Sequence, residues 1–179
     1  MEKRDKNKPE MELTVIKDEF SLYATDDFAR VDNLCKGLLL RFYEQLQQEG
    51  LSPEEATELA NSADYFVRDF VVDFKAFNLF DEMPGIVRQF AGNWYIAKTL
   101  EPDIRQLSGH LRGIRAFYRF LHGHGLISAG YMRNIEKECD ELPFYESRIA
   151  SFWEIKDDGY YAWERECSLR EGDVRGGHA

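Results

Sequence analysis

The stretch that most constrains the fold runs from Asp103 to Ser128, DIRQLSGHLRGIRAFYRFLHGHGLIS, because it predicts one helix with two chemically opposed faces. Apolar side chains recur there at intervals of three and four residues, which places them on a single stripe. The stripe consists of Leu107, Leu111, Ile114, Phe117, Tyr118 and Leu121. A second stripe with the same spacing is cationic and holds Arg105, Arg112, Arg115, Arg119 and His122. We therefore expect a helix that packs through one face and projects four guanidinium groups from the other.

The segments around this helix have the same helical period and are separated by Gly and Pro. Ser52-Pro53-Glu54-Glu55 has the pattern of a capping box with proline at the first helical position. The predicted helices run from Asp26 or Asp27 to Gly50, from Ser52 to near Met83, from Ile86 to Leu100, from Asp103 to Gly123 or Gly125, from Ser128 to about Leu142, and from Pro143 through Phe152. Short connections between long amphipathic helices indicate an all-α fold, a single-domain helical bundle of four to six helices.

The domain organisation predicted from these patterns has three parts. Residues 1–25 carry no strong periodicity and form an N-terminal arm, residues 26–155 form the bundle, and residues 156–179 form a C-terminal extension or tail. In the stretch FWEIKDDGYYAWERE, aromatic and β-branched residues flank the turn-forming cluster Asp157-Asp158-Gly159. The segment therefore suits either a helix or a small C-terminal β-hairpin, and the sequence leaves both open.

Composition excludes several classes of protein. With 44% hydrophobic and 14% aromatic residues, the 179-residue chain can bury a substantial core. Its three cysteines, Cys35, Cys139 and Cys167, are odd in number and lack CxxC spacing, which predicts free thiols rather than a disulfide framework or a thiolate metal site. No apolar run is long enough to span a bilayer and the first residues are charged, so we expect a cytoplasmic protein with no membrane partner.

The net charge of −10 is unevenly distributed along the chain. Residues 1–84 hold 10 Lys and Arg against 19 Asp and Glu, residues 85–124 hold 6 against 2, and residues 125–179 hold 7 against 12. A basic segment is thus embedded in an acidic protein, and it coincides with the predicted cationic helix. The acidic average disfavours polyanion binding, while the local excess of arginine favours it.

No catalytic motif accompanies these features. The chain contains no Gly-rich phosphate loop, HExxH, GxSxG or dinucleotide-binding fingerprint, so we predict that it is not an enzyme and uses no cofactor. His122 and His124 are two residues apart, point in different directions on a helix and have no further ligand nearby, which argues against a metal site.

Two segments resemble the core-binding domain of the tyrosine recombinase, or phage-integrase, family. LRGIRAFYRFLHGHGLIS, residues 111–128, is similar to the penultimate helix and following turn of that domain, and FYEQLQQEGLSPEEATELANSADYFVRDFV, residues 42–71, resembles its opening unit. The resemblance covers roughly residues 28–140 and implies a helical domain that clamps one face of DNA, while a separate catalytic domain cleaves the strand.

The catalytic part of that family is not recognisable here. The His-x-x-Arg signature cannot be placed, because the residues three positions after His110, His122 and His124 are Gly113, Gly125 and Ile127. The 54 residues that follow Gly125 are too few for the second domain. The resemblance therefore implies DNA binding without recombinase activity.

Two hypotheses for the function follow. In the first, Arg105, Arg112, Arg115 and Arg119 bind DNA or another polyanion, although the same row also fits a solvated face that pairs with carboxylates, or a protein partner. In the second, the chain is a protein-interaction or homo-oligomer-forming module with an acidic surface and no nucleic-acid binding. Its interface would use Trp153, Tyr160, Tyr161 and Trp163, which otherwise fold back onto the bundle.

Overall fold

The computed structural model describes residues 13–167, and within that range all regular secondary structure is helical, without a strand. The elements are η1 (Lys17–Phe20), α1 (Asp27–Gln48), α2 (Pro53–Asp64), η2 (Tyr65–Phe74), α3 (Ile86–Gln89), η3 (Phe90–Trp94), α4 (Tyr95–Lys98), α5 (Ile104–Gly123), α6 (Ala129–Cys139), α7 (Leu142–Trp153) and α8 (Tyr160–Arg165). The element η1 is a 3₁₀ turn, whereas η2 and η3 are π-helical. The predicted all-α bundle is confirmed.

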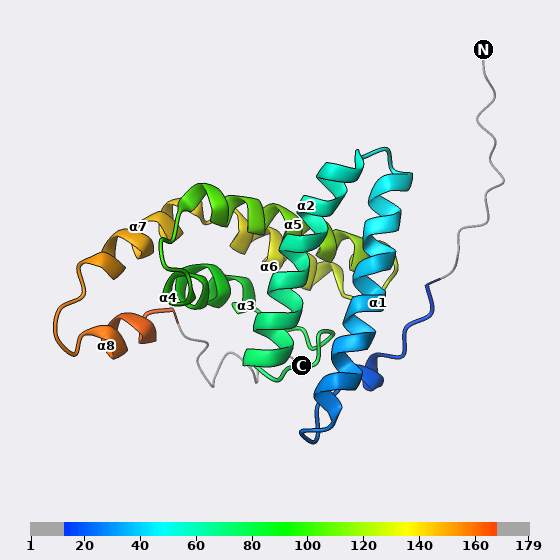
Figure 1. Cartoon of the computed structure of the whole chain (residues 1–179), viewed down its shortest axis with the longest axis horizontal. Coiled ribbons are helices and arrows are strands. Elements are labelled where there is room, and N and C mark those ends of the chain that lie inside the picture. The colour runs from blue at the N-terminus through cyan, green and yellow to red at the C-terminus, as the bar shows by residue number, and fades with distance from the viewer. Residues whose placement is uncertain (1–12, 168–179) are drawn as a thin grey trace, which may run out of the picture.

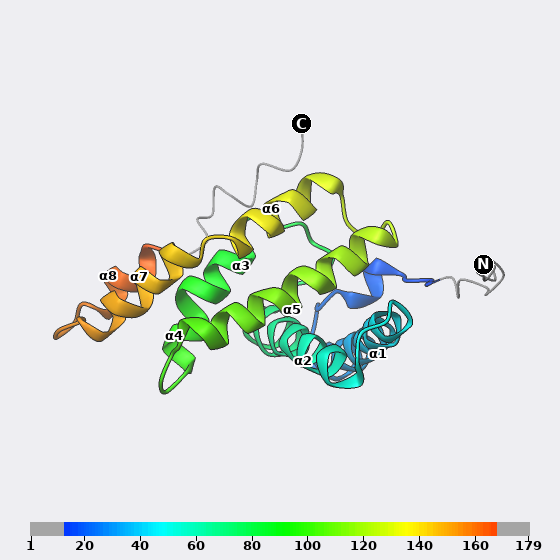
Figure 2. The ribbon, with the colours of Figure 1, turned by 90° about the horizontal axis from the view of Figure 1, so that it is seen from above.

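The helices form an elongated bundle with a helical hairpin at each end (Figure 1). The antiparallel pair α1 and α2 lies at one end, and α7 with α8 lies at the other (Figures 1 and 2). Between them runs α5, with α6 along one side and α2 along the other (Figure 2). The predicted cationic helix is therefore the central element of the fold.

The apolar stripe of α5 is buried as predicted. All six of its residues, Leu107, Leu111, Ile114, Phe117, Tyr118 and Leu121, are at most 3% exposed. On its flank, α5 crosses α2 at Gly113, where a Cβ atom would lie 2.6 Å from the Leu59 carbonyl oxygen. The absence of a side chain at this glycine thus sets how closely the two helices approach.

The predicted helix starts are confirmed at three positions. Ser52 and Glu55 form the capping box, each side chain accepting a hydrogen bond from the other residue's backbone N–H. The Asp103 carboxylate accepts from the second and third residues after it and caps α5, and Ser128 accepts from the Tyr131 N–H and caps α6. Local side-chain chemistry therefore fixes where these helices begin.

The helix predicted from Ser52 to Met83 is shorter than expected. It continues from α2 into η2 and stops at Phe74, because Ala76 adopts a left-handed backbone with φ of 52°. The Ala76 N–H then donates to the Val72 carbonyl and the Phe77 N–H to the Val71 carbonyl, a nested pair like that of a Schellman C-cap but with each bond one residue wider. That position usually holds glycine, and an alanine there is no signal for a helix end. The helical period places Phe74 on the apolar face with Phe66 and Phe70, but Phe74 is 52% exposed.

The hairpin alternative for the C-terminal stretch is wrong. Asp157, Asp158 and Gly159 form the turn that joins α7 to the short helix α8. Trp163 of α8 is 5% exposed and packs on Phe152 of α7, with ring centroids 5.1 Å apart, and this contact favours the helix over an isolated hairpin. The predicted tail from residue 168 onward lies outside the described residues.

The arm predicted for residues 1–25 is described from residue 13. It contains η1, whose Phe20 is buried against Phe80 with ring centroids 4.9 Å apart. Leu13 and Val15 belong to no strand. The division into arm, bundle and extension stays a prediction.

The three cysteines are free, as predicted, and all three are buried, with Cys35 at 0% exposure. Burial raises the pKa of the Cys35 and Cys139 thiols to about 12 and that of Cys167 to about 11. A thiol that stays protonated is a poor nucleophile, so none of them suits covalent catalysis. Among the helices described here, none is both long and apolar enough to cross a membrane.

Candidate functional site

The four arginines predicted as the binding stripe lie on the outward face of α5, but they differ in their surroundings. Arg105 and Arg112 are exposed and form no ion pair with any residue in the range 13–167. Arg115 forms an ion pair with Asp140, and Arg119 contacts the Glu136 carboxylate through Nε and Nη2 at 3.0 and 2.9 Å. Half of the stripe therefore already has carboxylate partners.

Both ion pairs join α5 to α6 and depend on the register of these two helices. The Asp140 side chain is 71% exposed and that of Arg119 is 60% exposed, so water screens both pairs. Exposed pairs of this kind contribute about 0–1 kcal/mol. They hold the helix register weakly and leave Arg119 accessible, whereas the Arg115 side chain is only 28% exposed.

On the side of α5 away from α6, the arginine stripe lies near the first turn of α2, which contains Glu54 and Glu55. The Ser52 backbone N–H is the main reason why the pKa of Glu55 is lowered, and the charge of Arg112 adds to the shift. Arg112 therefore lies within electrostatic range of one carboxylate. Its guanidinium group still has no direct hydrogen bond with a described side chain.

Sequence reasoning missed two further cations on α6. Arg133 and Lys137 are exposed and lie on the same helix as Glu136, the partner of Arg119. We define the α5–α6 face as Arg105, Arg112, Arg115, Arg119, Arg133 and Lys137. These six cations have four carboxylates close to them, those of Glu55, Asp103, Glu136 and Asp140, and they outnumber these carboxylates by two. Only the α5–α6 ion pairs reveal that the two helices share one face.

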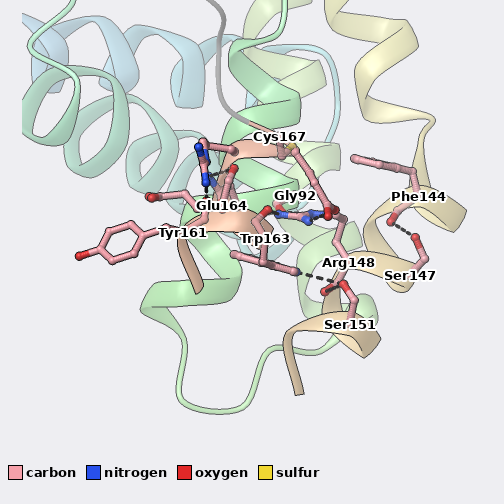
Figure 3. A network of polar contacts seen from close by, with 12 residues as sticks. Gly92, Phe144, Ser147, Arg148, Ser151, Tyr161, Trp163, Glu164 and Cys167 are labelled. Atoms are coloured by element: carbon pink, nitrogen blue, oxygen red, sulfur yellow. Dashed lines mark hydrogen bonds and ion pairs between the residues drawn. The ribbon is translucent and has the colours of Figure 1, made fainter. Parts of the chain in front are cut away.

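The four aromatic residues predicted to form an interface differ in their exposure. Trp163 is 5% exposed and Tyr160 is half-buried, so these two fold back onto the bundle. Trp153 is 61% exposed and Tyr161 is 70% exposed. Tyr161 points away from Arg148 and Trp163 (Figure 3). Only Trp153 and Tyr161 remain available to a partner.

A buried arginine fixes α8 to the rest of the bundle. Arg148 of α7 donates to the Gly92 carbonyl at 2.9 Å, to the Trp163 carbonyl at 2.8 Å and to the Glu166 carboxylate at 2.9 Å (Figure 3). Its guanidinium also lies 3.8 Å from the centre of the Trp163 ring. Burial lowers the pKa of Arg148. These contacts join α7 to η3 and to the α8 segment, which is a structural role.

A buried carboxylate has a similar structural role. Glu138 of α6 accepts hydrogen bonds from the backbone N–H groups of Gly85, Val87 and Arg88 at 2.6–3.0 Å. Burial raises the pKa of Glu138, and the three N–H donors act in the opposite direction. The carboxylate therefore caps the start of α3 from a different helix.

These features define a class of protein rather than a family. Among residues 13–167, no group of His, Cys, Asp and Glu is placed to hold a metal ion. Comparison with protein-family models, with curated proteins and with solved structures gives no match. The chain is thus an all-α bundle with a locally cationic α5–α6 face.

Proposed function

We propose that the chain is a non-catalytic DNA-binding module that contacts the phosphate backbone through the α5–α6 face. The observation that carries this proposal is the excess of cations over nearby carboxylates on that face, in a protein whose net charge is −10. Helix α5 contributes four arginines and no Asp or Glu over its twenty residues. The resemblance of residues 111–128 to a recombinase core-binding domain also supports this function.

The arginines of this face should contribute unequally to DNA affinity, because only some of them already form ion pairs. Arg105, Arg112 and Arg133 have no carboxylate to release, so each gains a full phosphate contact on binding. Arg115 and Arg119 must exchange Asp140 and Glu136 for a phosphate, and the weakness of exposed ion pairs makes this exchange inexpensive but not free. We expect the first three residues to contribute more to affinity.

Fluorescence anisotropy with a labelled random duplex tests the proposal. The variant Arg105→Gln, Arg112→Gln, Arg133→Gln removes three charges from the α5–α6 face. The matched control Lys36→Gln, Lys156→Gln, Arg165→Gln removes three exposed charges from other parts of the surface. The affinity of the wild type should fall with added salt, with a log–log slope of about −0.9 for each phosphate contacted.

The first variant should lose most of its affinity and have a salt slope about three units shallower, while the control should resemble the wild type. Equal losses in both variants would show that only the total charge matters. Absence of salt-dependent binding in the wild type would exclude this function.

A second function is favoured by Trp153 and Tyr161, the exposed aromatic residues of the α7–α8 hairpin. Aromatic side chains of this size are enriched in protein interfaces, and Arg148 already holds the hairpin in place, so little ordering entropy would be lost on binding. In this alternative the chain is a protein-interaction or homo-oligomer-forming module. Sedimentation velocity of the wild type and of Trp153→Ser, Tyr161→Ser tests self-association directly, since dimers should disappear in the variant.

A further inference from the structure

A cavity of about 280 Å³ lies where the end of η2 meets η3, α4 and α8. Both π-helical segments contribute to its wall, Phe74 from η2 and Trp94 from η3, and such wider turns are frequent at functional sites. The volume lies just below the range of about 300–1,000 Å³ for ligand pockets. The cavity therefore suits one small molecule with a single ring.

Three of the side chains that line this cavity are aromatic and keep accessible surface. Phe74 is 52% exposed, and Trp94 and Tyr160 are half-buried. The Phe74 and Trp94 ring centroids are 6.0 Å apart, and their planes meet at 47°. Rings pack against one another in tilted or offset arrangements at centroid distances of about 4.5–7 Å, so this open ring surface favours a planar aromatic ligand.

Lys75, the C-cap residue of η2, is a half-buried lysine in the same wall. Its ammonium nitrogen lies 5.7 Å from the centre of the Phe74 ring and 5.6 Å from the centre of the Phe77 ring. Both distances are near the outer limit of about 6 Å for a cation–π contact, so the rings shield the ammonium group from water but stabilise its charge only weakly. No carboxylate in the range 13–167 forms an ion pair with Lys75.

These surroundings favour the neutral form of the amine. Burial lowers the pKa of Lys75, and the charge of Glu164 on α8 acts in the opposite direction. Only the neutral amine has the free electron pair that attacks a carbonyl carbon. At neutral pH, a larger share of Lys75 is therefore reactive than of an exposed lysine.

The backbone beside Lys75 is fixed in an unusual conformation. The Lys75 N–H donates to the Phe70 carbonyl at 2.9 Å, and the next residue, Ala76, has a φ of 52°. Non-glycine residues in this left-handed region persist only where the surrounding structure determines them, and they cluster at active sites and ligand clamps. A strained backbone thus holds Lys75 at the edge of the cavity.

We propose that Lys75 is a nucleophilic lysine and that this cavity takes a small aromatic aldehyde, with which Lys75 forms an imine. The amine nitrogen attacks the aldehyde carbon, and one N–H proton passes to the carbonyl oxygen to give a carbinolamine. The hydroxyl group then leaves with the second N–H proton as water, so a C=N bond replaces the C=O bond and nothing is oxidised or reduced. The site shares no residue with the α5–α6 face, so it is independent of the proposed DNA contact.

Reductive trapping on the full chain tests the assignment. The protein is incubated with benzaldehyde at neutral pH, the imine is reduced with sodium cyanoborohydride to a stable benzylamine, and the labelled lysines are mapped by peptide mass spectrometry. Lys36 and Lys156, two exposed lysines of the same chain, are internal references. Propanal is the non-aromatic comparison probe.

Benzaldehyde should label Lys75 at least about tenfold faster than either reference lysine, because more of the Lys75 amine is neutral and the cavity holds the ring beside it. The ratio of Lys75 to Lys36 labelling should be smaller with propanal. This ratio cancels the difference in intrinsic reactivity between the two aldehydes.

Ala97→Leu narrows the cavity without changing Lys75, and Ala29→Leu, on the exposed side of α1, is the matched control. The first variant should slow the labelling of Lys75 several-fold and leave Lys36 unchanged, and the control should resemble the wild type. Far-ultraviolet circular dichroism of both variants monitors the fold.

The wild type alone can overturn the inference, since labelling of Lys75 no faster than Lys36 and Lys156 would show that it is an ordinary lysine. An equal Lys75-to-Lys36 ratio for benzaldehyde and propanal would exclude selection of an aromatic ring. Unchanged labelling of Lys75 in folded Ala97→Leu would show that the cavity does not hold the aldehyde.

Discussion

The crossing of α5 over α2 provides a sharp test of the fold, because two glycines of the same helix have opposite surroundings. A Cβ atom at Gly113 would overlap the Ser62 Cβ atom and would lie 2.6 Å from the Leu59 carbonyl oxygen. A Cβ atom at Gly109 would meet nothing within 4 Å. Alanine should therefore destabilise the protein at Gly113 and stabilise it at Gly109.

The magnitudes follow from helix propensity and packing. Glycine inside a helix costs about 0.5–1 kcal/mol relative to alanine, so Gly109→Ala should raise the free energy of unfolding by about that amount. Gly113→Ala gains the same propensity term, but the helices must move apart or shift, and overpacking a tight core contact costs about 1–3 kcal/mol. Since the obstructing atoms include backbone, we expect the upper half of that range and a net loss of about 1–2 kcal/mol.

Urea and thermal unfolding followed by far-ultraviolet circular dichroism measure the difference. For a chain of this size, 1 kcal/mol shifts Tm by roughly 2–4 °C, so the two variants should differ by about 5 °C or more. A Gly113→Ala protein as stable as the wild type would refute the close crossing. Destabilisation by Gly109→Ala would refute the open space around Gly109.

Three further predictions concern polar contacts. Arg148→Met leaves two buried carbonyls without donors, so it should lower the free energy of unfolding in urea by about 2–4 kcal/mol, and the fluorescence of Trp163 should change first. Glu166→Gln should lower it little, because the Glu166 side chain is 68% exposed. Glu138→Gln turns an amide N–H₂ toward the backbone N–H donors of α3 and should cost about 1–3 kcal/mol in the same assay. The hydrogen bond from Arg30 and two backbone N–H groups lower the pKa of Asp27 to about 2. The stabilisation by the Asp27 carboxylate is therefore present above pH 4 and is lost as the pH falls toward 2. The free energies of unfolding of the wild type and of Asp27→Asn should converge across this range.

Much of the fold could be predicted because its signals are local. The capping box at Ser52, the cap at Asp103 and the apolar stripe of α5 each depend on residues within a few positions of one another. The end of η2 could not be predicted, because Ala76 adopts a conformation that usually marks glycine. The π-helical turns also lack a sequence signature, and they change which residues face the core, as the exposure of Phe74 shows.

The candidate sites depended on contacts between distant segments, and the sequence therefore described them incompletely. The row from Arg105 to Arg119 was visible as a helical repeat, but its pairing with Glu136 and Asp140 requires the register of α5 against α6.

The ion pairs of Arg115 with Asp140 and of Arg119 with Glu136 allow a test of whether the α5–α6 face binds phosphate. The carboxylates of α6 neutralise the arginines nearest to them, while Arg105 and Arg112 lie beyond the reach of those two residues along α5. Removing the carboxylates with Glu136→Gln, Asp140→Asn would free Arg115 and Arg119 without adding a cation. If phosphate contacts drive binding, this variant should bind DNA more tightly than the wild type and with a steeper salt slope, because two more arginines become available. If the row only joins α5 to α6, the variant should lose a little stability, at most about 1 kcal/mol for each exposed pair, and gain no affinity.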